Sequence, residues 1–307
     1  MSLEDDLATN DEARRKRLKP LLAPDEVESI LRVHYAGSEQ ESVRVVRQLD
    51  SYDDVNYLVE VERVNFLFKV HNGVESEDFL QKSDPIDFYN SVSSVIHFQV
   101  AILEALQAQN IPSYRSVPPV GKSSPVLVKA LPVVSGERYD LVIRLLTWVE
   151  GHPMSGATFL PIESLVDAGY FLGRMDHALD TMSSSHDTDH TDWWTSSSLL
   201  EPGRRFHQWD GKNTGELRKF LCYIHDDKRR CMVESIVDAF DSALARHAEF
   251  RVGVNHADFN DANIIVGSDL RVVGVIDFGD SVERCVQSVA LRGLLLGKLE
   301  FIASLRG

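Results

Sequence analysis

The chain has 307 residues, of which 43% are hydrophobic and 26% charged, a composition typical of a globular protein that can bury a sizeable core. Its formal net charge of −15 works against binding to nucleic acid or to an anionic membrane, because such a surface repels phosphate groups. We therefore expect neither nucleic acid nor a membrane as a partner, and any site that binds phosphate must be built locally.

The cysteines and the N-terminal segment indicate a reducing compartment. Cys222, Cys231 and Cys285 are odd in number and widely spaced, which favours neither a disulfide framework nor a zinc site. The N-terminal residues are acidic and then basic without an apolar stretch, and no window approaches the length of a membrane span. We therefore expect a cytoplasmic protein.

The first part of the chain predicts a short helix followed by an antiparallel sheet. Residues 1–20 are polar and are expected to be disordered. An amphipathic helix is expected from Pro24, because apolar residues recur at helical spacing. Three strands follow, and the tight turn between the last two favours a meander: Val43–Leu49, Asn56–Glu62 and Asn65–Asn72.

The middle of the chain predicts a boundary between two lobes. A helix with one apolar stripe is expected from Ser91 to Pro112, and Glu104 is the acid within it. Two strands follow, and the second breaks at Gly151. We expect an N-terminal lobe over residues 1–146, a hinge over 147–151 and a second lobe over 152–307.

The second lobe is expected to be mainly helical. Apolar periodicity predicts a helix over Leu160–Asp180, with Leu165, Ala168, Leu172 and Met175 facing the core, and helical structure over Glu216–Ala248. The serine- and aspartate-rich segment between them holds acids and histidines without ligand spacing, so a loop is favoured over a metal site there.

Two motifs near the end carry the chemistry. HADFNDAN, from His256 to Asn263, and IDFGD, which contains Asp277, each follow a short apolar strand. Asp258 is placed to accept or orient the proton of an attacking hydroxyl group, and Asn263 and Asp277 offer the hard oxygen atoms that Mg²⁺ requires. His256 is expected to orient the loop backbone. If Asp258 and Asp277 were only caps of a turn and a helix, their ordered combination would be unexplained.

Lys69 permits two interpretations. It lies between Phe68 and Val70 near the end of the third strand, where a lysine often points to solvent on the alternate face. Its place in an N-terminal meander, upstream of the two motifs, favours instead a lysine that binds the α- and β-phosphates of a nucleotide. The preceding DSYDDVN segment lacks the glycine-rich sequence that covers phosphates in protein kinases.

The chain resembles the aminoglycoside phosphotransferase-like kinase superfamily and, within it, the hydroxylysine kinases. The resemblance rests on HADFNDANIIV and GVIDFGD together with YDDVNYLV, LTWVEG and LGRMDHAL, and it covers roughly residues 25–281. It implies an α+β, bilobal protein-kinase-like fold with an antiparallel-sheet N-lobe, a mainly helical C-lobe and the nucleotide between them.

The resemblance also implies roles for single residues. Asp258 would be the catalytic base and Lys69 the phosphate-binding lysine. Glu104, the only acid of the helix expected over Ser91 to Pro112, is the candidate that pairs with this lysine. The remaining implied contacts are Asn56 with the nucleotide, Thr147, Trp148 and Val149 with its base, Asn263 and Asp277 with Mg²⁺, and Asp280 with the metal or the acceptor.

The function predicted from this resemblance is transfer of the γ-phosphate of GTP or ATP to an alcohol, with Mg²⁺ as cofactor and a hydroxylated amine as substrate. The best candidate acceptor is 5-hydroxy-L-lysine, and choline-like, homoserine or aminoglycoside acceptors are alternatives. The tail after IDFGD lacks the family's GxxxxDLA-like signature, so we expect a truncated C-lobe. A non-catalytic nucleotide-binding remnant or interaction protein is therefore a further alternative.

Overall fold

The computed structural model describes residues 12–38, 40–80, 94–184, 211–246, 249–250 and 252–285. The chain forms two compact units. Unit 1 comprises Met1–Glu104 and Ser113–Val149, and unit 2 comprises Ala105–Pro112 and Glu150–Gly307. The histidines and acids between residues 186 and 192, and the tail beyond residue 285, lie outside the described residues.

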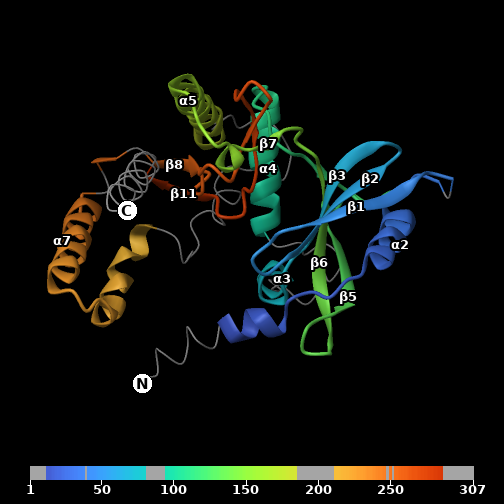
Figure 1. Ribbon diagram of the computed structural model, residues 1–307, viewed down its shortest axis with the longest axis horizontal. Coiled ribbons are helices and arrows are strands. Elements are labelled where there is room, and N and C mark those ends of the chain that lie inside the picture. Colours follow the sequence, from blue (N-terminus) through green and yellow to red (C-terminus); the bar gives the residue numbers. More distant parts are fainter. Residues whose placement is uncertain are drawn as a thin grey trace. The chain divides into compact units, whose positions relative to one another are not determined.

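Unit 1 contains an antiparallel six-stranded sheet (Figure 1), and the expected meander forms its first three strands. The turn between the second and third strands is tight, with φ of 50° at Glu62 and 66° at Arg63, as in the turns that match strand twist. The strand order is β1 (Val43–Leu49), β2 (Val55–Val61), β3 (Val64–Val70), β6 (Arg138–Thr147) and β4 (Ser116–Val117), and β5 (Leu127–Pro132) also pairs with β6.

One face of this sheet is apolar and lies against helix α2 (Pro24–His34) (Figure 1). Val27, Ile30 and Leu31 of α2 are buried against alternate residues of the strands, including Phe68 and Ile143. Because side chains alternate between the two faces of a strand, the residues between these apolar positions point to the opposite face. That face receives Asn56, Lys69 and Arg144, which the strand register aligns across β2, β3 and β6.

The opposite face is covered in part by helices α3 (Gly73–Leu80) and α4 (Ser94–Ala108). Phe79 of α3 and Ile96 of α4 pack against Val142 of β6. The prediction of a helix upstream of Pro112 agrees with α4, although residues 91–93 lie outside the described part. Helix α3 was not expected from the sequence.

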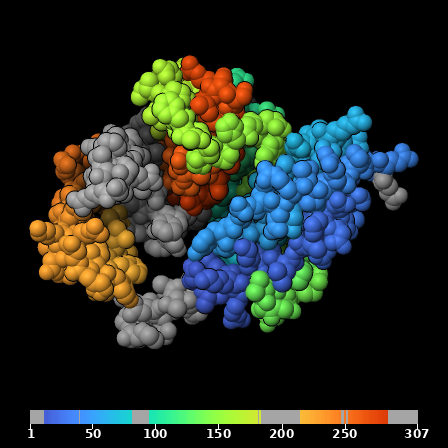
Figure 2. All heavy atoms as spheres, in the orientation of Figure 1, coloured from blue at the N-terminus to red at the C-terminus, as the bar shows by residue number. Residues whose placement is uncertain are grey.

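The ordered part of unit 1 begins earlier than residue 20. Residues 12–17 are helical and Leu18 is buried in the core, so the expectation of disorder over residues 1–20 is wrong for this stretch. Val134 N–H donates a hydrogen bond to the Lys19 carbonyl, and Ser135 N–H donates to that of Arg17. The tip of the β5–β6 hairpin therefore lies beside the N-terminal segment, as the green and dark blue atoms of Figure 2 show.

Unit 2 combines helices with short strands. Its helices are α5 (Ile162–Ser184), α7 (Asp227–Leu244) and two 3₁₀ segments, η1 (Met154–Gly156) and η3 (Gly211–Tyr223). Its strands are β7 (His152–Pro153), β9 (Ile264–Val266) and β10 (Val272–Val275) in one sheet, and β8 (Val252–Asn255) and β11 (Val282–Cys285) in another. None of the helices in the described ranges is long and apolar enough to cross a membrane.

Two of the four residues of α5 that were expected to face the core do not do so. Ala168 and Met175 are buried as expected, but Phe171 replaces Leu172 in the core and Leu165 is half exposed. The same helix holds the β9–β10 hairpin, because Asp167 Oδ2 accepts a hydrogen bond of 2.7 Å from Val272 N–H.

Gly151 lets the chain pass closely over this sheet as it enters unit 2. Its φ is +135°, and a Cβ there would lie 2.6 Å from the Val266 carbonyl oxygen and 2.8 Å from Cγ2 of Ile265. Only a residue without a side chain fits such a backbone position.

We predict that Gly151→Ala lowers the free energy of unfolding by about 2 kcal/mol or more, because it adds both backbone strain and a clash. Gly156→Ala is the matched control, since an added Cβ there meets nothing within 4 Å. Urea unfolding of both variants measures the difference. Equal stabilities would contradict this account of Gly151.

Candidate active site

The HADFNDAN motif forms a tight loop between β8 and β9 in unit 2. Ala257 has φ of 65°, which turns the chain sharply after His256. Asn260 N–H then donates to the Asp258 carbonyl at 2.9 Å. The loop is also held from outside, because Ser155 N–H of η1 donates to the Asp261 carbonyl at 3.0 Å.

Two amide side chains hold the Asp258 carboxylate. Asn260 Nδ2 donates to Oδ1 at 2.9 Å, and Asn263 Nδ2 donates to Oδ2 at 2.8 Å and to the Asp258 carbonyl at 2.9 Å. Each carboxylate oxygen keeps a further lone pair that can accept a proton or a hydrogen bond. The carboxylate is therefore fixed in orientation but still able to act on a hydroxyl group.

Asn260 is a site residue that the sequence interpretation missed. Besides holding Asp258, its Oδ1 accepts hydrogen bonds from Ala262 N–H at 2.9 Å and from Asn263 N–H at 3.2 Å. Asparagine commonly bonds the backbone two residues further on, and its position two residues after Asp258 was the available signal.

His256 joins the two motifs. Its Nδ1 accepts from Asp258 N–H at 3.2 Å, so the ring hydrogen lies on Nε2, which donates to the Ile276 carbonyl at 2.9 Å. The ring is buried and lies 4.5 Å from that of Phe278, measured between centroids. Burial lowers the pKa of His256, which keeps the imidazole in this neutral, bridging form.

Asn263 and Asp277 have the atoms that a magnesium site needs. Both hydrogen bonds of Asn263 Nδ2 go to Asp258, which leaves Oδ1 as the atom available for a cation. Asp277 has φ of 63°, and its Oδ1 accepts from Gly279 N–H at 3.3 Å. Within the described part of the chain, neither Asn263 Oδ1 nor Asp277 Oδ2 has a protein partner. These oxygens fit Mg²⁺, which prefers hard oxygen donors.

Asp280 completes the second motif. It lies half-buried in the turn that leads from IDFGD into β11.

In unit 1, Lys69 pairs with an acid that the sequence interpretation did not select. Its Nζ lies 2.8 Å from Asp54 Oδ2, and the two side chains are only 18% and 8% exposed. The solvent-facing interpretation of Lys69 is therefore wrong. Glu104, the expected partner, is instead an exposed residue of α4.

The strand register explains the pairing. Lys69 lies directly opposite Asn56, and Asp54 stands two residues before Asn56, on the same face. Burial would raise the pKa of Asp54, but Lys69, His71 and the Asn72 N–H together hold it below its usual value. The Oδ1 atom of Asn56 is buried, and it has no hydrogen-bond partner among the residues that the structure describes.

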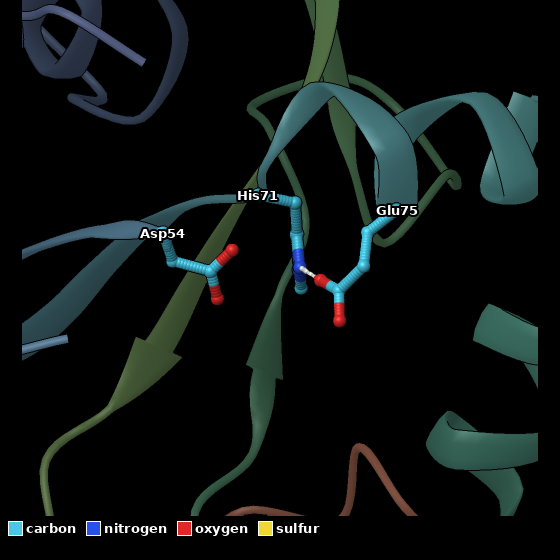
Figure 3. Close-up of side chains that lie close together, drawn as sticks. All are labelled: Asp54, His71 and Glu75. Atoms are coloured by element: carbon cyan, nitrogen blue, oxygen red, sulfur yellow. Dashed lines mark hydrogen bonds and ion pairs between the residues drawn. The ribbon is translucent and has the colours of Figure 1, made fainter. Parts of the chain in front are cut away.

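Asp54, His71 and Glu75 form a cluster that resembles a metal site. Their ligand atoms lie within 4.8 Å of one another, and Figure 3 shows His71 between the two acids. His71 Nδ1 shares a hydrogen bond of 2.8 Å with Glu75 Oε2. Because Asp54 already binds the Lys69 ammonium group, a metal ion there would meet an adjacent positive charge. We interpret the cluster as an ion-pair network.

The segment expected to form the hinge follows β6. Thr147 N–H donates to the Arg115 carbonyl and Trp148 N–H to that of Asn65, at 2.9 and 3.3 Å. Among the described residues, the backbone groups of Val149 have no protein partner. Both the N–H and the C=O group of Val149 can therefore bind a ligand.

The chain is similar to known proteins over most of its length. A profile of the phosphotransferase enzyme family (APH) matches residues 45–283. Hydroxylysine kinase of Danio rerio is 24% identical over 278 residues, which cover 86% of this chain and 67% of the relative. The Mus musculus hydroxylysine kinase is 25% identical over 255 residues, which cover 78% and 60%. The chain thus spans about two thirds or less of the length of these relatives.

A solved structure shows the fold. The GDP complex of an aminoglycoside 2′-phosphotransferase mutant superposes with a TM-score of 0.50 at 14% identity, covering 86% of this chain and 74% of that one. The antiparallel sheet of unit 1 and the helices of unit 2 correspond to its protein-kinase-like fold. Because the family profile matches residues 45–283, which is more than half of the chain, the chain belongs to the phosphotransferase enzyme family.

Proposed function

We propose that the protein is a small-molecule kinase that transfers the γ-phosphate of GTP or ATP to a hydroxyl group, with 5-hydroxy-L-lysine as the acceptor. The observation that carries this proposal is the Asp258 carboxylate, fixed by the amides of Asn260 and Asn263 in a loop tied to the second motif.

Asp258 acts as the base or orienting group. Its carboxylate accepts the hydrogen of the acceptor hydroxyl, so that the oxygen attacks the γ-phosphorus with its lone pair. The bond from the γ-phosphorus to the oxygen that bridges it to the β-phosphate breaks, and GDP or ADP leaves. The amides of Asn260 and Asn263 keep the carboxylate oriented during this step. Positioning of this kind supplies much of the rate enhancement in phosphoryl transfer.

Asn263 Oδ1 and Asp277 would hold Mg²⁺, and Asp280 would assist with the metal or the acceptor. When bound, Mg²⁺ neutralises charge on the β- and γ-phosphates. Asp277 presents its carboxylate from a backbone with positive φ, a conformation that the Gly279 hydrogen bond supports.

Unit 1 would bind the nucleotide. Lys69 supplies a cation for the α- and β-phosphates. Asn56 lies opposite it, and its buried Oδ1 can accept a hydrogen bond from a donor such as a ribose hydroxyl group. The base of the nucleotide would lie beside Thr147, Trp148 and Val149. The backbone groups of Val149 can form hydrogen bonds with it. We propose lobes at residues 1–146 and 152–307, joined by residues 147–151.

Two observations support 5-hydroxy-L-lysine as the acceptor: the names of the similar proteins and the net charge of the chain. The relatives named above are hydroxylysine kinases. A net charge of −15 attracts a cationic amine, and carboxylates can bind its ammonium group.

We predict that Asp258→Asn lowers kcat with 5-hydroxylysine at least about a hundredfold, because an amide cannot accept the hydroxyl proton. Coupled nucleotide-consumption assays with GTP and with ATP measure this change. Asp269→Asn, in the exposed β9–β10 turn, is the control and should retain full activity. Undiminished turnover in Asp258→Asn would refute the assignment.

We further predict that Asp277→Asn raises the Mg²⁺ concentration for half-maximal activity at least about tenfold, because a charged ligand is lost. Titration of Mg²⁺ at saturating nucleotide gives this value, and removal of the metal with EDTA should abolish turnover of the wild type. An unchanged Mg²⁺ requirement would show that Asp277 is not a metal ligand.

A further inference from the structure

We propose that Asp54 is the positioning residue for Lys69, so that the loop before β2, and not helix α4, supplies the carboxylate that holds the nucleotide-binding lysine. This inference rests on the proposed function, because it concerns how the same lysine is held. It concerns a residue outside the catalytic and magnesium-binding motifs.

The geometry comes from the sheet itself. Asn56 of β2 lies opposite Lys69 of β3, and Asp54 lies in the loop two residues before Asn56. The contact of Asp54 with Lys69 places its carboxylate on the same face of the sheet as the lysine. The resulting contact is 2.8 Å long and largely shielded from water. A shielded pair is screened less by salt than a surface pair.

Asp54 is fixed independently of Lys69. Its Oδ1 accepts from Asn72 N–H at 2.8 Å, at the end of β3. The buried Asn72 side chain in turn donates to the carbonyls of Arg15 and Asp53, at 2.9 and 3.2 Å. These bonds lock the loop to β3, so the carboxylate can determine where the lysine lies.

Helix α4 makes one polar contact with a neighbouring strand. Gln99 Oε1 accepts from Arg144 Nη1 at 2.6 Å, one strand further along the sheet than Lys69. Glu104 is exposed on the same helix. This hydrogen bond joins the helix to β6, whereas Lys69 on β3 forms an ion pair with Asp54 of the loop.

The expected consequence is a selective loss of rate. A lysine side chain has a flexible four-carbon stem, and ordering it costs conformational entropy. Without Asp54, Lys69 can still contact phosphate, but its side-chain nitrogen is no longer held in one position. Binding of nucleotide should therefore survive better than turnover, which depends on placement.

The test compares two neighbouring aspartates. For Asp54→Asn we expect kcat to fall at least about tenfold, while the nucleotide KM changes by less than about threefold. Asp53→Asn is the matched control, because Asp53 pairs with Arg15 at 2.7 Å and not with the lysine. It should retain the wild-type kcat. Asp54→Glu, which keeps a carboxylate, should recover part of the lost rate.

A double-mutant cycle separates positioning from a general structural effect. If Asp54 acts through Lys69, then Asp54→Asn adds no further loss of kcat to Lys69→Met. Additive losses, or equal losses in Asp54→Asn and Asp53→Asn, would overturn the inference and leave the proposed function intact. If Asp54→Asn does not fold, as thermal unfolding would reveal, a kcat in a folded Asp54→Glu no better than that of Lys69→Met overturns it.

Wild-type protein that transfers phosphate to no alcohol acceptor and binds neither GTP nor ATP would overturn the proposed function and this inference together. Fluorescent-nucleotide displacement gives the binding result without any acceptor.

Discussion

The candidate site depends on one buried imidazole. His256 accepts a hydrogen bond from the backbone of Asp258 with one ring nitrogen and donates to the Ile276 carbonyl with the other. The loop that carries the base is thereby tied to the strand end that carries Asp277. A second hydrogen bond joins the same two segments, because Ile276 N–H donates to the Asn263 carbonyl at 2.9 Å. Because the ring is buried beside Phe278, the bridging form is protected from water and from protonation.

A comparable constraint operates in unit 1, where a sheet separates an apolar from a polar face. Val55, Phe68 and Ile143 point towards α2, so the register forces Asn56, Lys69 and Arg144 onto the other side. The alternation of side chains along the strands therefore places apolar residues in the core and the cationic side chains of Lys69 and Arg144 on the opposite face. Burial of Lys69 is tolerated because Asp54 neutralises it at hydrogen-bonding distance.

The sequence predicted the parts of this structure that depend on local pattern. The bounds of β1 agree to the residue, and β2, β3 and α4 lie close to their predicted ranges, because alternation and apolar stripes are local signals. The features that the sequence did not predict depend on contacts between residues that are far apart in the sequence. A stripe of apolar residues that is shifted by one position is equally periodic, so only packing decides that Phe171 and not Leu172 is buried. The Asp54 pairing needs the hairpin register, and the role of Asn260 needs the folded loop.

The most direct test of the account is identification of the product. Purified protein is incubated with Mg²⁺, GTP or ATP and 5-hydroxylysine, and the acceptor is analysed by mass spectrometry, with lysine as the control that lacks the hydroxyl group. The account predicts a phosphorylated 5-hydroxylysine, formed with at least one of the two nucleotides, and unmodified lysine. Nucleotide binding without a phosphorylated product from 5-hydroxylysine or any other amino alcohol would contradict it.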